Sequence, residues 1–475
     1  MSKRSPVRVL AALLVLFGAW MMAGRAQVEG DTLWHIRVGK WIVEHGEIPK
    51  TGLFSWSAPD APWHAHEWLW EVLAYSAHSA GGFSGVWGLT AAGVFLFGGA
   101  LFALTRRGGW PAFFPAAFAV FDSAFRFNAR PHAMAFGLWG LWIWFLDRKA
   151  PSLRGFPVLA VSFLMTAFWA NVHASAAMAV FFALVYAVFR PEARRAYLPA
   201  AGGAFLGSLA NPWGAGLYPY AYLASRHPEI TENIAEWASP NFHDTKFAFV
   251  WLTFLVLSVG VVAYGTRTGR LPAWGPEVVF TLTGLVLSLV SVRNYPYFYF
   301  TAAWLLSRGL EDVRLPERVV RFFRHAGTLF ASLLFLFGAA LLPPDGPENP
   351  REGVPFPVEA VRFMKEHGLT DRVMAQYQWG GYLIFNDIPA FIDGRADMYV
   401  LSGSGILNAY TRFMLAQDPK THAFVDPAEV AERYGARTAV LLRNSLPAHF
   451  LERAGWSKVY EDDLAVVLVR GGEGG

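Results

Sequence analysis

The sequence predicts a polytopic α-helical membrane protein of about eleven transmembrane helices with a C-terminal extracytoplasmic α/β domain. Of its 475 residues, 54% are hydrophobic and only 16% are charged, whereas soluble domains carry about 25% charged residues. Apolar stretches recur along the first 343 residues, many of them long enough to cross the hydrocarbon core of a bilayer. After a stretch rich in proline, glycine and glutamate at 343–350, the composition changes to that of a soluble domain.

The apolar runs, taken in order, predict eleven spans. They cover residues 8–25, 84–105, 110–125, 131–147, 156–171, 174–190, 197–212, 247–266, 275–292, 294–308 and 326–343. The first span leaves an alternative open. Lys3, Arg4 and Arg8 precede an apolar stretch that ends in Gly24-Arg25-Ala26, a pattern also typical of a cleaved signal peptide.

Basic residues occupy alternate connections between the spans, which sets the orientation of the chain. On one side lie Lys3, Arg4 and Arg8; Arg106 and Arg107; Arg148, Lys149 and Arg154; Arg190, Arg194 and Arg195; Arg267 and Arg270; and Arg308, Arg314, Arg318, Arg321 and Arg324. Positive connections face the cytoplasm, so the N-terminus is expected there, and an odd number of spans places the C-terminal domain outside. The abundance of Arg over Lys, with much Ala and Gly, indicates a GC-rich bacterial genome, and hence the bacterial inner (plasma) membrane.

Charge and cysteine content exclude several classes of protein. Residues 1–343 carry a net charge of +9 and residues 344–475 a net charge of −5, which gives the overall +4. A basic membrane half is what cytoplasmic loops produce, so we expect no nucleic-acid partner. The chain has no cysteine, which excludes disulfides, thiolate metal ligands and thiol nucleophiles.

Two domains are expected: residues 1–343, a transmembrane domain with a long first outer loop at 27–83, and residues 344–475, the soluble domain. In the soluble domain the patterns predict helices at 357–367, 404–416 and 426–434, and strands near 372–376, 390–393, 437–442 and 464–469. No internal repeat is evident.

Histidine collects on the outer side of the membrane. Of the ten histidines before residue 344, only His325 is expected inside. The other nine are His35, His45, His64, His66, His78, His132, His173, His227 and His243. Polar aromatic rings favour membrane interfaces, which is the simpler explanation for any one of them.

The first outer loop holds the candidate acids. Asp31 follows the first span, and His35 lies one turn later if the segment is helical. A lone carboxylate at this position also suits an N-cap or a solvated loop. Further along, Glu67 follows His64 and His66. The His-x-His pair is a weak metal signal because no third ligand accompanies it in the sequence.

Further polar residues lie at the predicted outer ends of spans, where ionisable groups near lipid usually line a cavity. They are Arg126, Arg130, Asn171, His132, His173, Asn211, Glu236 and Arg293. Together these residues predict an outer cavity suited to an anionic lipid headgroup. Arginine binds phosphate through a planar fork, and a divalent metal on Asp31, His64 and His66 would neutralise the same phosphate. Asn211 begins Asn-Pro-Trp-Gly, which predicts a helix stop and turn in any case.

The chain resembles the polytopic glycosyltransferases of the GT-C superfamily, which use polyprenyl-phosphate-linked sugars. The resemblance rests on Gly30-Asp31-Thr32-Leu33-Trp34-His35 at the start of the first outer loop and implies that Asp31 is catalytic or binds metal. The segment 372–384 is similar to the Trp-Trp-Asp-Tyr-Gly-Tyr region of oligosaccharyltransferases, with Gly381-Tyr382 as the final Gly-Tyr. Tyr377, Gln378 and Trp379 stand in place of Trp-Trp-Asp, which argues against recognition of the glycosylation sequon.

The whole chain also resembles a group of bacterial membrane proteins with Gly-Asp-x-x-x-His, a His-Glu-Trp loop, and a tail with Trp-Gly-Gly-Tyr-Leu and Ile-Asp-Gly-Arg-Ala-Asp, here Ile392–Asp397. In the second tail motif, Asp393, Arg395 and Asp397 contact substrate or pair with one another at a turn, and pairing is the simpler interpretation.

The resulting hypothesis is an inverting glycosyl transfer from a polyprenyl-phosphate lipid donor to a glycan, lipid or protein acceptor. Asp31 is the expected base or metal ligand, with Glu67 in reserve and Mg²⁺ or Mn²⁺ rather than Zn²⁺ as the metal. The expected substrate contacts are His35, Arg126, Arg130, His132, His173, Asn211, Glu236 and Arg293. Two alternatives stay open: a transporter or lipid-binding or glycan-binding scaffold, and a metal-dependent membrane hydrolase.

Overall fold

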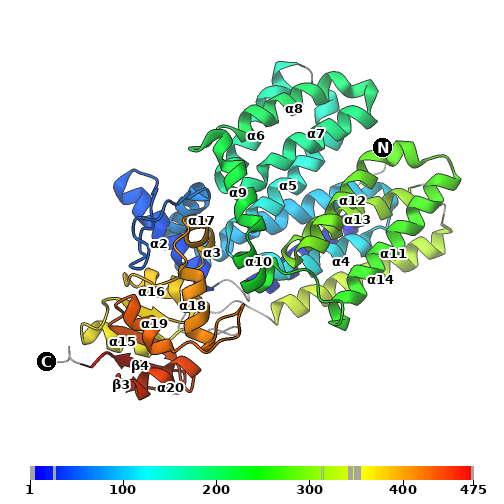
Figure 1. The fold of residues 1–475 in the computed structure, drawn as a ribbon. Helices are drawn as coiled ribbons and strands as arrows, with labels where there is room; N and C mark the ends of the chain where they lie inside the picture. The colour runs from blue at the N-terminus through cyan, green and yellow to red at the C-terminus, as the bar shows by residue number, and fades with distance from the viewer. Residues whose placement is uncertain are drawn as a thin grey trace. The chain divides into compact units, whose positions relative to one another are not determined.

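The computed structural model describes residues 6–24, 28–153, 155–311, 313, 315–340, 346 and 355–471. The end of the candidate signal-peptide site, Arg25 and Ala26, lies outside these residues. The chain forms two compact units (Figure 1). The helical unit comprises residues 1–26, 86–218 and 234–343, and the second unit comprises residues 27–85, 219–233 and 344–475.

Each of the eleven predicted spans overlaps a helix. The helices are α1 (Pro6–Ala23), α3 (Trp68–Leu104), α4 (Phe113–Ser123), α5 (Pro131–Arg148), α6 (Phe156–Val172), α7 (Met178–Phe189), α8 (Arg194–Ser208), α11 (Thr245–Arg267), α12 (Gly275–Val290), α13 (Tyr295–Gly309) and α14 (Glu317–Ala339). Helix α3 begins sixteen residues before the predicted span, and its backbone breaks at Gly81 and Gly82. The break separates residues 68–80, which include Glu71 and His78, from the second part that the sequence pattern detected.

Small residues bring the helices of the helical unit into close contact. A Cβ atom at Gly338 of α14 would lie 2.1 Å from the carbonyl oxygen of Gly18 on α1. A Cβ atom at Gly203 of α8 would lie 2.2 Å from the carbonyl oxygen of Leu159 on α6. Helices pack this closely in membranes through small residues, because apolar burial drives association less strongly there than in water.

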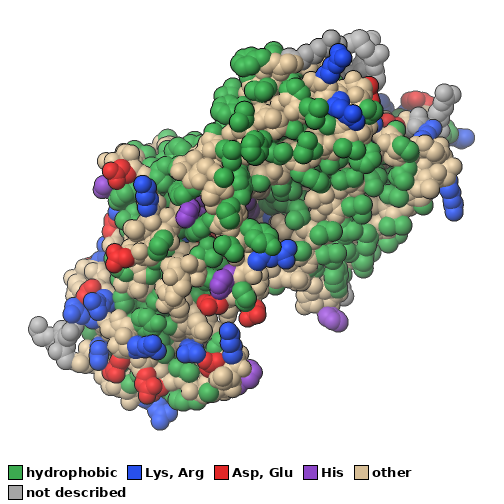
Figure 2. Space-filling view, turned by 45° about the horizontal axis from the view of Figure 1, so that its top comes forward, with side chains coloured by type: hydrophobic (Ala, Val, Ile, Leu, Met, Phe, Trp, Pro, Cys, Tyr) green, Lys and Arg blue, Asp and Glu red, His purple; other side chains and the backbone are tan. Residues whose placement is uncertain are grey.

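The outer faces of these helices are apolar, as a lipid-exposed surface requires. Phe156, Phe249 and Phe322 are exposed by 78%, 73% and 66%, and Figure 2 shows hydrophobic side chains covering much of the visible helical surface. Among the described residues, five helices are long and apolar enough to cross a membrane, or six if the bent pair Ala174–Phe189 and Pro191–Leu209 forms one span. The chain is a polytopic membrane protein, and the count of eleven stays a prediction.

A buried ion network joins three helix ends inside the helical unit. Arg308, near the end of α13, donates from Nε to Glu277 Oε1 on α12 at 2.6 Å. Its other nitrogens reach Glu311 at 2.7 Å and Asp147 at the end of α5 at 3.4 Å. The Glu277 side chain is fully buried, so its charge depends on Arg308 for compensation.

The second unit is an α/β structure built on a four-stranded sheet in the order β1-β2-β4-β3. Strand β1 pairs parallel with β2, and the other pairs are antiparallel. The strands are β1 (Val373–Ala375), β2 (Thr438–Leu442), β3 (Ser457–Glu461) and β4 (Ala465–Val469). The helices are α2 (Gly30–His45), α9 (Leu217–Arg226, from Pro219), α10 (Pro228–Asn233), α15 (Val358–Glu366), α16 (Gly380–Phe385), α17 (Ala396–Leu401), α18 (Ile406–Leu415), α19 (Pro427–Arg433) and α20 (Leu446–Arg453).

Most predicted elements of the tail are present, with one error and several omissions. The strand expected at 390–393 is absent, because Ala390 makes only isolated bridges to Ser55 and Val373 before the chain turns at Asp393. The prediction missed α16, α17 and α20. Strand β3 was also missed, since it is an edge strand of mostly exposed residues without a buried face.

The first outer loop belongs to the second unit rather than to the helical unit, unlike the domain division expected from the sequence. Leu33 of α2 is buried in the core of the α/β structure together with Val373, Trp379 and Val440. A Cβ atom at Gly381 of α16 would lie 1.8 Å from the carbonyl oxygen of Gly30. The start of α2 is therefore held against the tail by backbone contact.

Candidate functional site

The helical unit gathers a basic cluster, defined here as Arg126, Arg130, His132, His173, Glu236 and Arg293. Arg130 Nη1 lies 3.3 Å from both carboxylate oxygens of Glu236, and Arg293 Nη1 lies 4.0 Å from Oε1. Arg293 also covers the ring of Trp237 at 4.1 Å. Arg126, His132 and His173 complete the electrostatic neighbourhood. Three guanidinium groups surround one carboxylate, so the cluster carries excess positive charge.

Two short segments position Glu236 in the basic cluster. The 3₁₀ turn η8 (Ala235–Trp237) docks on η10 (Val292–Asn294), with Val292 N donating to Ala238 O at 3.1 Å and Ser291 Oγ to Glu236 O at 2.8 Å. Burial raises the pKa of Glu236, but Arg130 and Arg293 outweigh it and lower the pKa to about 2. Glu236 is therefore ionised at neutral pH and fixes the guanidinium groups.

Asn211 occupies its own turn rather than the basic cluster. Its amide donates to Ser208 O at 2.9 Å and Gly214 O at 3.1 Å, and its carbonyl oxygen accepts from Trp213 N at 2.9 Å. The helix stop that Asn211-Pro212-Trp213-Gly214 predicted accounts for these bonds. A substrate contact by Asn211 has no support beyond its sequence position.

The second unit contains a separate group of acids and imidazoles, here the loop network of His35, His66, Glu67 and Glu71. His35 lies between two carboxylates, with Nε2 3.9 Å from Glu67 Oε2 and Nδ1 3.5 Å from Glu71 Oε1. His66 Nε2 lies 3.7 Å from Glu67 Oε1. His35 and Glu71 are buried, whereas Glu67 is half-buried. The sequence analysis did not select Glu71, although its position four residues after Glu67 is a signal for a shared helix face.

Asp31 lies in the first turn of α2 and is half-buried. Its Oδ1 accepts a hydrogen bond from Trp34 Nε1 at 3.1 Å. A Cβ atom at Gly394 would lie only 1.7 Å from the same oxygen, so the Asp31 carboxylate occupies the space beside the 393–395 backbone. The helix that places His35 one turn after Asp31 is present as predicted.

Four residues of the tail, here named the 393–399 clamp, hold this region together: Asp393, Arg395, Asp397 and Tyr399. Arg395 donates from Nε and Nη2 to the two carboxylate oxygens of Asp393, each at 2.7 Å, and Tyr399 donates to Asp393 Oδ2 at 2.7 Å. Burial raises the pKa of Asp393, but Arg395 outweighs it and the net shift is downward. The pairing interpretation of the motif therefore holds for Asp393 and Arg395.

Asp397 faces a different partner. It accepts a hydrogen bond at 2.7 Å from the hydroxyl group of Tyr220, a residue that sequence reasoning missed because nothing in its local sequence marks it. The Tyr220 ring stacks on His64 with centroids 4.1 Å apart. Burial lowers the pKa of His64, and the neighbouring His66 lowers it further. His64 is therefore mainly neutral at pH 7.

The donor set does not fit the expected metal site. Among the residues that the structure describes, no group of three or more His, Asp or Glu side chains is arranged to hold a metal ion. Of the expected ligands, His64 stacks on Tyr220, and His66 Nδ1 lies 3.0 Å from the carbonyl oxygen of His64. The dependence of the protein on a divalent metal stays a prediction.

No protein-family model and no curated protein matches the chain. Solved structures do. The archaeal oligosaccharyltransferase AglB from Archaeoglobus fulgidus, in complex with an inhibitory peptide and a dolichol-phosphate, matches with a TM-score of 0.61 and 11% identity over 92% of this chain and 69% of AglB. ArnT from Cupriavidus metallidurans, bound to undecaprenyl phosphate, matches with a TM-score of 0.58 and 13% identity over 98% of both chains.

The chain shares the fold of these two proteins. Structures of the same two proteins in the apo state match at TM-scores of 0.54 and 0.57. At 10–13% identity these likenesses show the fold alone. Proteins that share a fold can differ in the chemistry of their sites. The prediction of a polytopic α-helical membrane protein is confirmed, and the extracytoplasmic placement of the C-terminal domain stays a prediction.

Proposed function

We propose that this protein is a glycosyltransferase that moves a sugar from a polyprenyl-phosphate-linked donor to an acceptor on the extracytoplasmic face of the bacterial plasma membrane. The observation that carries the proposal is the GT-C fold, shared with two transferases solved with dolichol phosphate and undecaprenyl phosphate. The grouping of carboxylates on the first outer loop supports it from the chemistry of the chain itself.

The reaction is an inverting displacement. The acceptor hydroxyl oxygen attacks the anomeric carbon, the bond from that carbon to the phosphate oxygen breaks, and the lipid phosphate leaves with the bonding electron pair. We assign proton removal from the hydroxyl to Asp31, with Glu67 as the second candidate. His35 bridges Glu67 and Glu71 and would pass the proton onward.

The basic cluster is assigned to the leaving phosphate. Arg130 and Arg293 share one carboxylate between them, so their charge is only partly neutralised and remains available to an anion. Guanidinium groups form paired hydrogen bonds with phosphate oxygens, and stabilisation of leaving-group charge is among the largest contributions to catalysis. His132 and His173 would add hydrogen-bond donors there.

Release of the lipid phosphate tests the proposal. The full chain in nanodiscs is supplied with undecaprenyl-phosphate-linked pentoses and hexoses and with a bacterial envelope fraction as acceptor, and free undecaprenyl phosphate is measured by mass spectrometry. Asp31→Asn should reduce release by about 100-fold or more, because general-base catalysis contributes about 10²- to 10⁴-fold. Asp60→Asn, an exposed acid of the same loop, is the matched control and should leave release unchanged.

Two results would contradict the proposal, one for the role of Asp31 and the other for the transfer reaction itself. Full activity of Asp31→Asn would remove Asp31 from the mechanism. A wild-type chain that binds undecaprenyl phosphate but releases none from any donor would exclude transfer and favour a lipid-binding scaffold.

A further inference from the structure

The side chain of Arg395 is almost completely buried, at 1% exposed, in a unit whose other arginines are mostly at the surface. Burying a guanidinium group costs several kcal/mol unless its hydrogen bonds are satisfied. Asp393 accepts two of these bonds in a paired arrangement, and its carboxylate is also fixed by Tyr399 and by the backbone nitrogen of Arg395. The pair is therefore rigid, with Arg395 held in one orientation.

The remaining contacts of Arg395 reach the first outer loop, more than 300 residues away in sequence. Nη1 donates to the carbonyl oxygen of Leu53 at 2.5 Å. The guanidinium carbon lies 4.9 Å from the ring centre of Trp63 and 6.0 Å from that of Trp34. Trp63 immediately precedes His64, and Trp34 is the residue that donates to Asp31. One side chain thus touches both stretches that carry the candidate acids.

A second contact from the 393–399 clamp reaches the same stretch. Asp397 binds the Tyr220 hydroxyl group, and the Tyr220 ring stacks on His64. Immediately before Arg395, Gly394 places bare backbone against the Asp31 carboxylate. The clamp therefore contacts α2, the 53–66 stretch and α9 at three separate positions.

We propose that Arg395 is a positioning residue, which fixes Asp31 and the loop network in a reactive arrangement without touching substrate. The inference rests on the proposed transferase function, because the loop network is the part of the site that it serves. The Asp31 carboxylate accepts a hydrogen bond from Trp34, so its orientation depends on how rigidly that ring is held. Two indole rings and a carbonyl group bound to one buried cation provide that rigidity.

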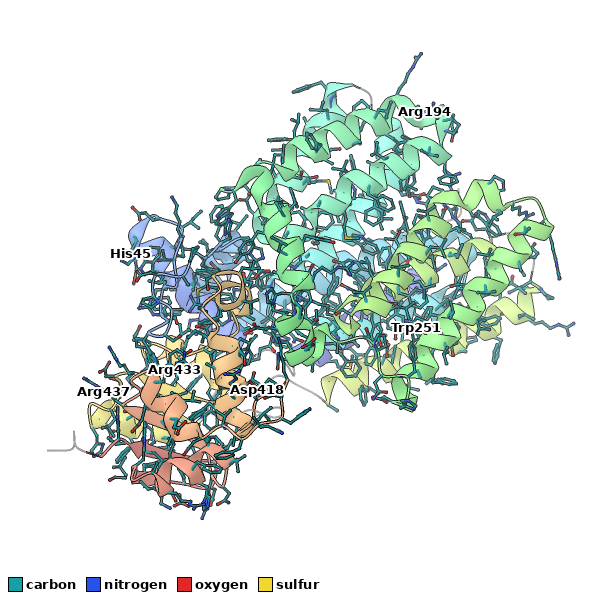
Figure 3. All side chains as sticks on the ribbon, viewed as in Figure 1. His45, Arg194, Trp251, Asp418, Arg433 and Arg437 are labelled. Carbon is teal, nitrogen blue, oxygen red and sulfur yellow. The ribbon has the colours of Figure 1, made fainter. Side chains whose placement is uncertain are left out.

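Arg395→Lys tests this assignment, with Arg437→Lys as the matched control. Arg437 pairs with Asp371 at 2.7 Å, the same distance as the Arg395 pair, but its side chain is half exposed. Figure 3 labels Arg437 on the C-terminal part of the chain. Lysine keeps the charge in both variants and removes the planar fork.

Two measurements are made on the full chain in nanodiscs. Hydrogen exchange, followed by mass spectrometry, should accelerate in the segments 28–40 and 50–66 of Arg395→Lys and stay unchanged in Arg437→Lys. The kcat for release of undecaprenyl phosphate should fall on the order of 10- to 100-fold, as expected for misplacement of a catalytic group by about 1 Å. The KM for the lipid donor should change less than twofold, because the phosphate contacts are assigned elsewhere.

The outcomes separate this inference from the proposed function. If hydrogen exchange in both segments of Arg395→Lys is the same as in the wild type, Arg395 has no positioning role, whatever the activity of the variant. Faster hydrogen exchange with an unchanged kcat would show that the positioning of the loop by Arg395 does not affect catalysis. A wild-type chain without transfer would contradict the proposed function alone, since exchange is measured independently. If Arg395→Lys does not fold, Tyr399→Phe removes one hydrogen bond from Asp393 and should produce the same two effects at smaller size.

Discussion

Replacing Gly394 with alanine provides a sharp test of where Asp31 acts. The new Cβ atom would lie 1.7 Å from Asp31 Oδ1, 2.6 Å from its Cγ and 2.9 Å from Trp34 Nε1. Cβ atoms do not approach other heavy atoms closer than 3.0 Å, so Oδ1 must move by at least about 1.3 Å. That shift breaks the hydrogen bond between Trp34 and Asp31, which is 3.1 Å long.

The costs to stability and to activity should differ widely. The atoms in the way belong to the end of a side chain rather than to backbone, so the stability cost should fall near about 1 kcal/mol, the low end for overpacking. Misplacement of a catalytic group by about 1 Å costs on the order of 10²-fold in rate. Gly394→Ala should therefore release undecaprenyl phosphate about 100-fold more slowly while its unfolding temperature falls by only a few degrees.

Thermal unfolding and the release assay are measured on the same nanodisc preparations. Gly202→Ala is the control, because a Cβ atom there meets nothing within 4 Å. If the activity of Gly394→Ala is within twofold of the wild type, the prediction is wrong. Either the Asp31 carboxylate does not lie beside Gly394, or its position does not affect the rate of release. A joint collapse of stability and activity would show that the strain is not confined to Asp31.

Two further predictions concern the helical unit. Glu236→Gln should lower the unfolding temperature by a constant amount at pH 5–8. Because the pKa of Glu236 is about 2 in the folded chain and 4.5 for an unperturbed glutamate, its ionised form stabilises the fold above pH 4.5 and this contribution disappears as pH falls toward 2. The difference in unfolding temperature between wild type and variant should shrink over that window, and a constant difference down to pH 2 would contradict the assignment. Arg308→Ala should reduce the free energy of unfolding by about 3–5 kcal/mol, because it leaves the buried Glu277 without its partner, and the unfolding temperature should fall strongly. Adding Glu277→Gln to the same chain should restore part of the lost stability. If it restores none, lost packing rather than lost charge compensation is responsible.

Local sequence patterns predicted the features that depend on local physics. A helix of about 20 apolar residues is the main solution for a chain in hydrocarbon, and so each predicted span overlaps a helix. Asp31 and His35 are spaced by one helical turn, and the segment that carries them does form a helix. Arg126, Arg130 and His132 are close in space because they are close in the sequence. The turn that the Asn-Pro-Trp-Gly segment predicted is present at Asn211, whereas its role as a site residue stays a prediction.

Other contacts depend on residues far apart in the chain. The strand expected at 390–393 has the right apolar residues, but the Asp393–Arg395 pair turns the chain at that point. The grouping of α2 with the tail needs Gly30 and Gly381 to meet, and no local pattern reports that meeting. Glu236 and Arg293 likewise join the basic cluster through loop docking at Ala238 and Val292.

The sequence alone determined that the chain spans a membrane by helices, because hydropathy is a property of short segments. It also led to the predictions that polar residues collect on one side of the membrane and that Asp31 heads the first outer loop. Only the tertiary structure decided that Arg395 and Asp397 from the tail contact that loop and that Glu71 and Tyr220 accompany it. Such contacts join residues hundreds of positions apart, and their energies depend on burial and geometry that exist only in the folded chain.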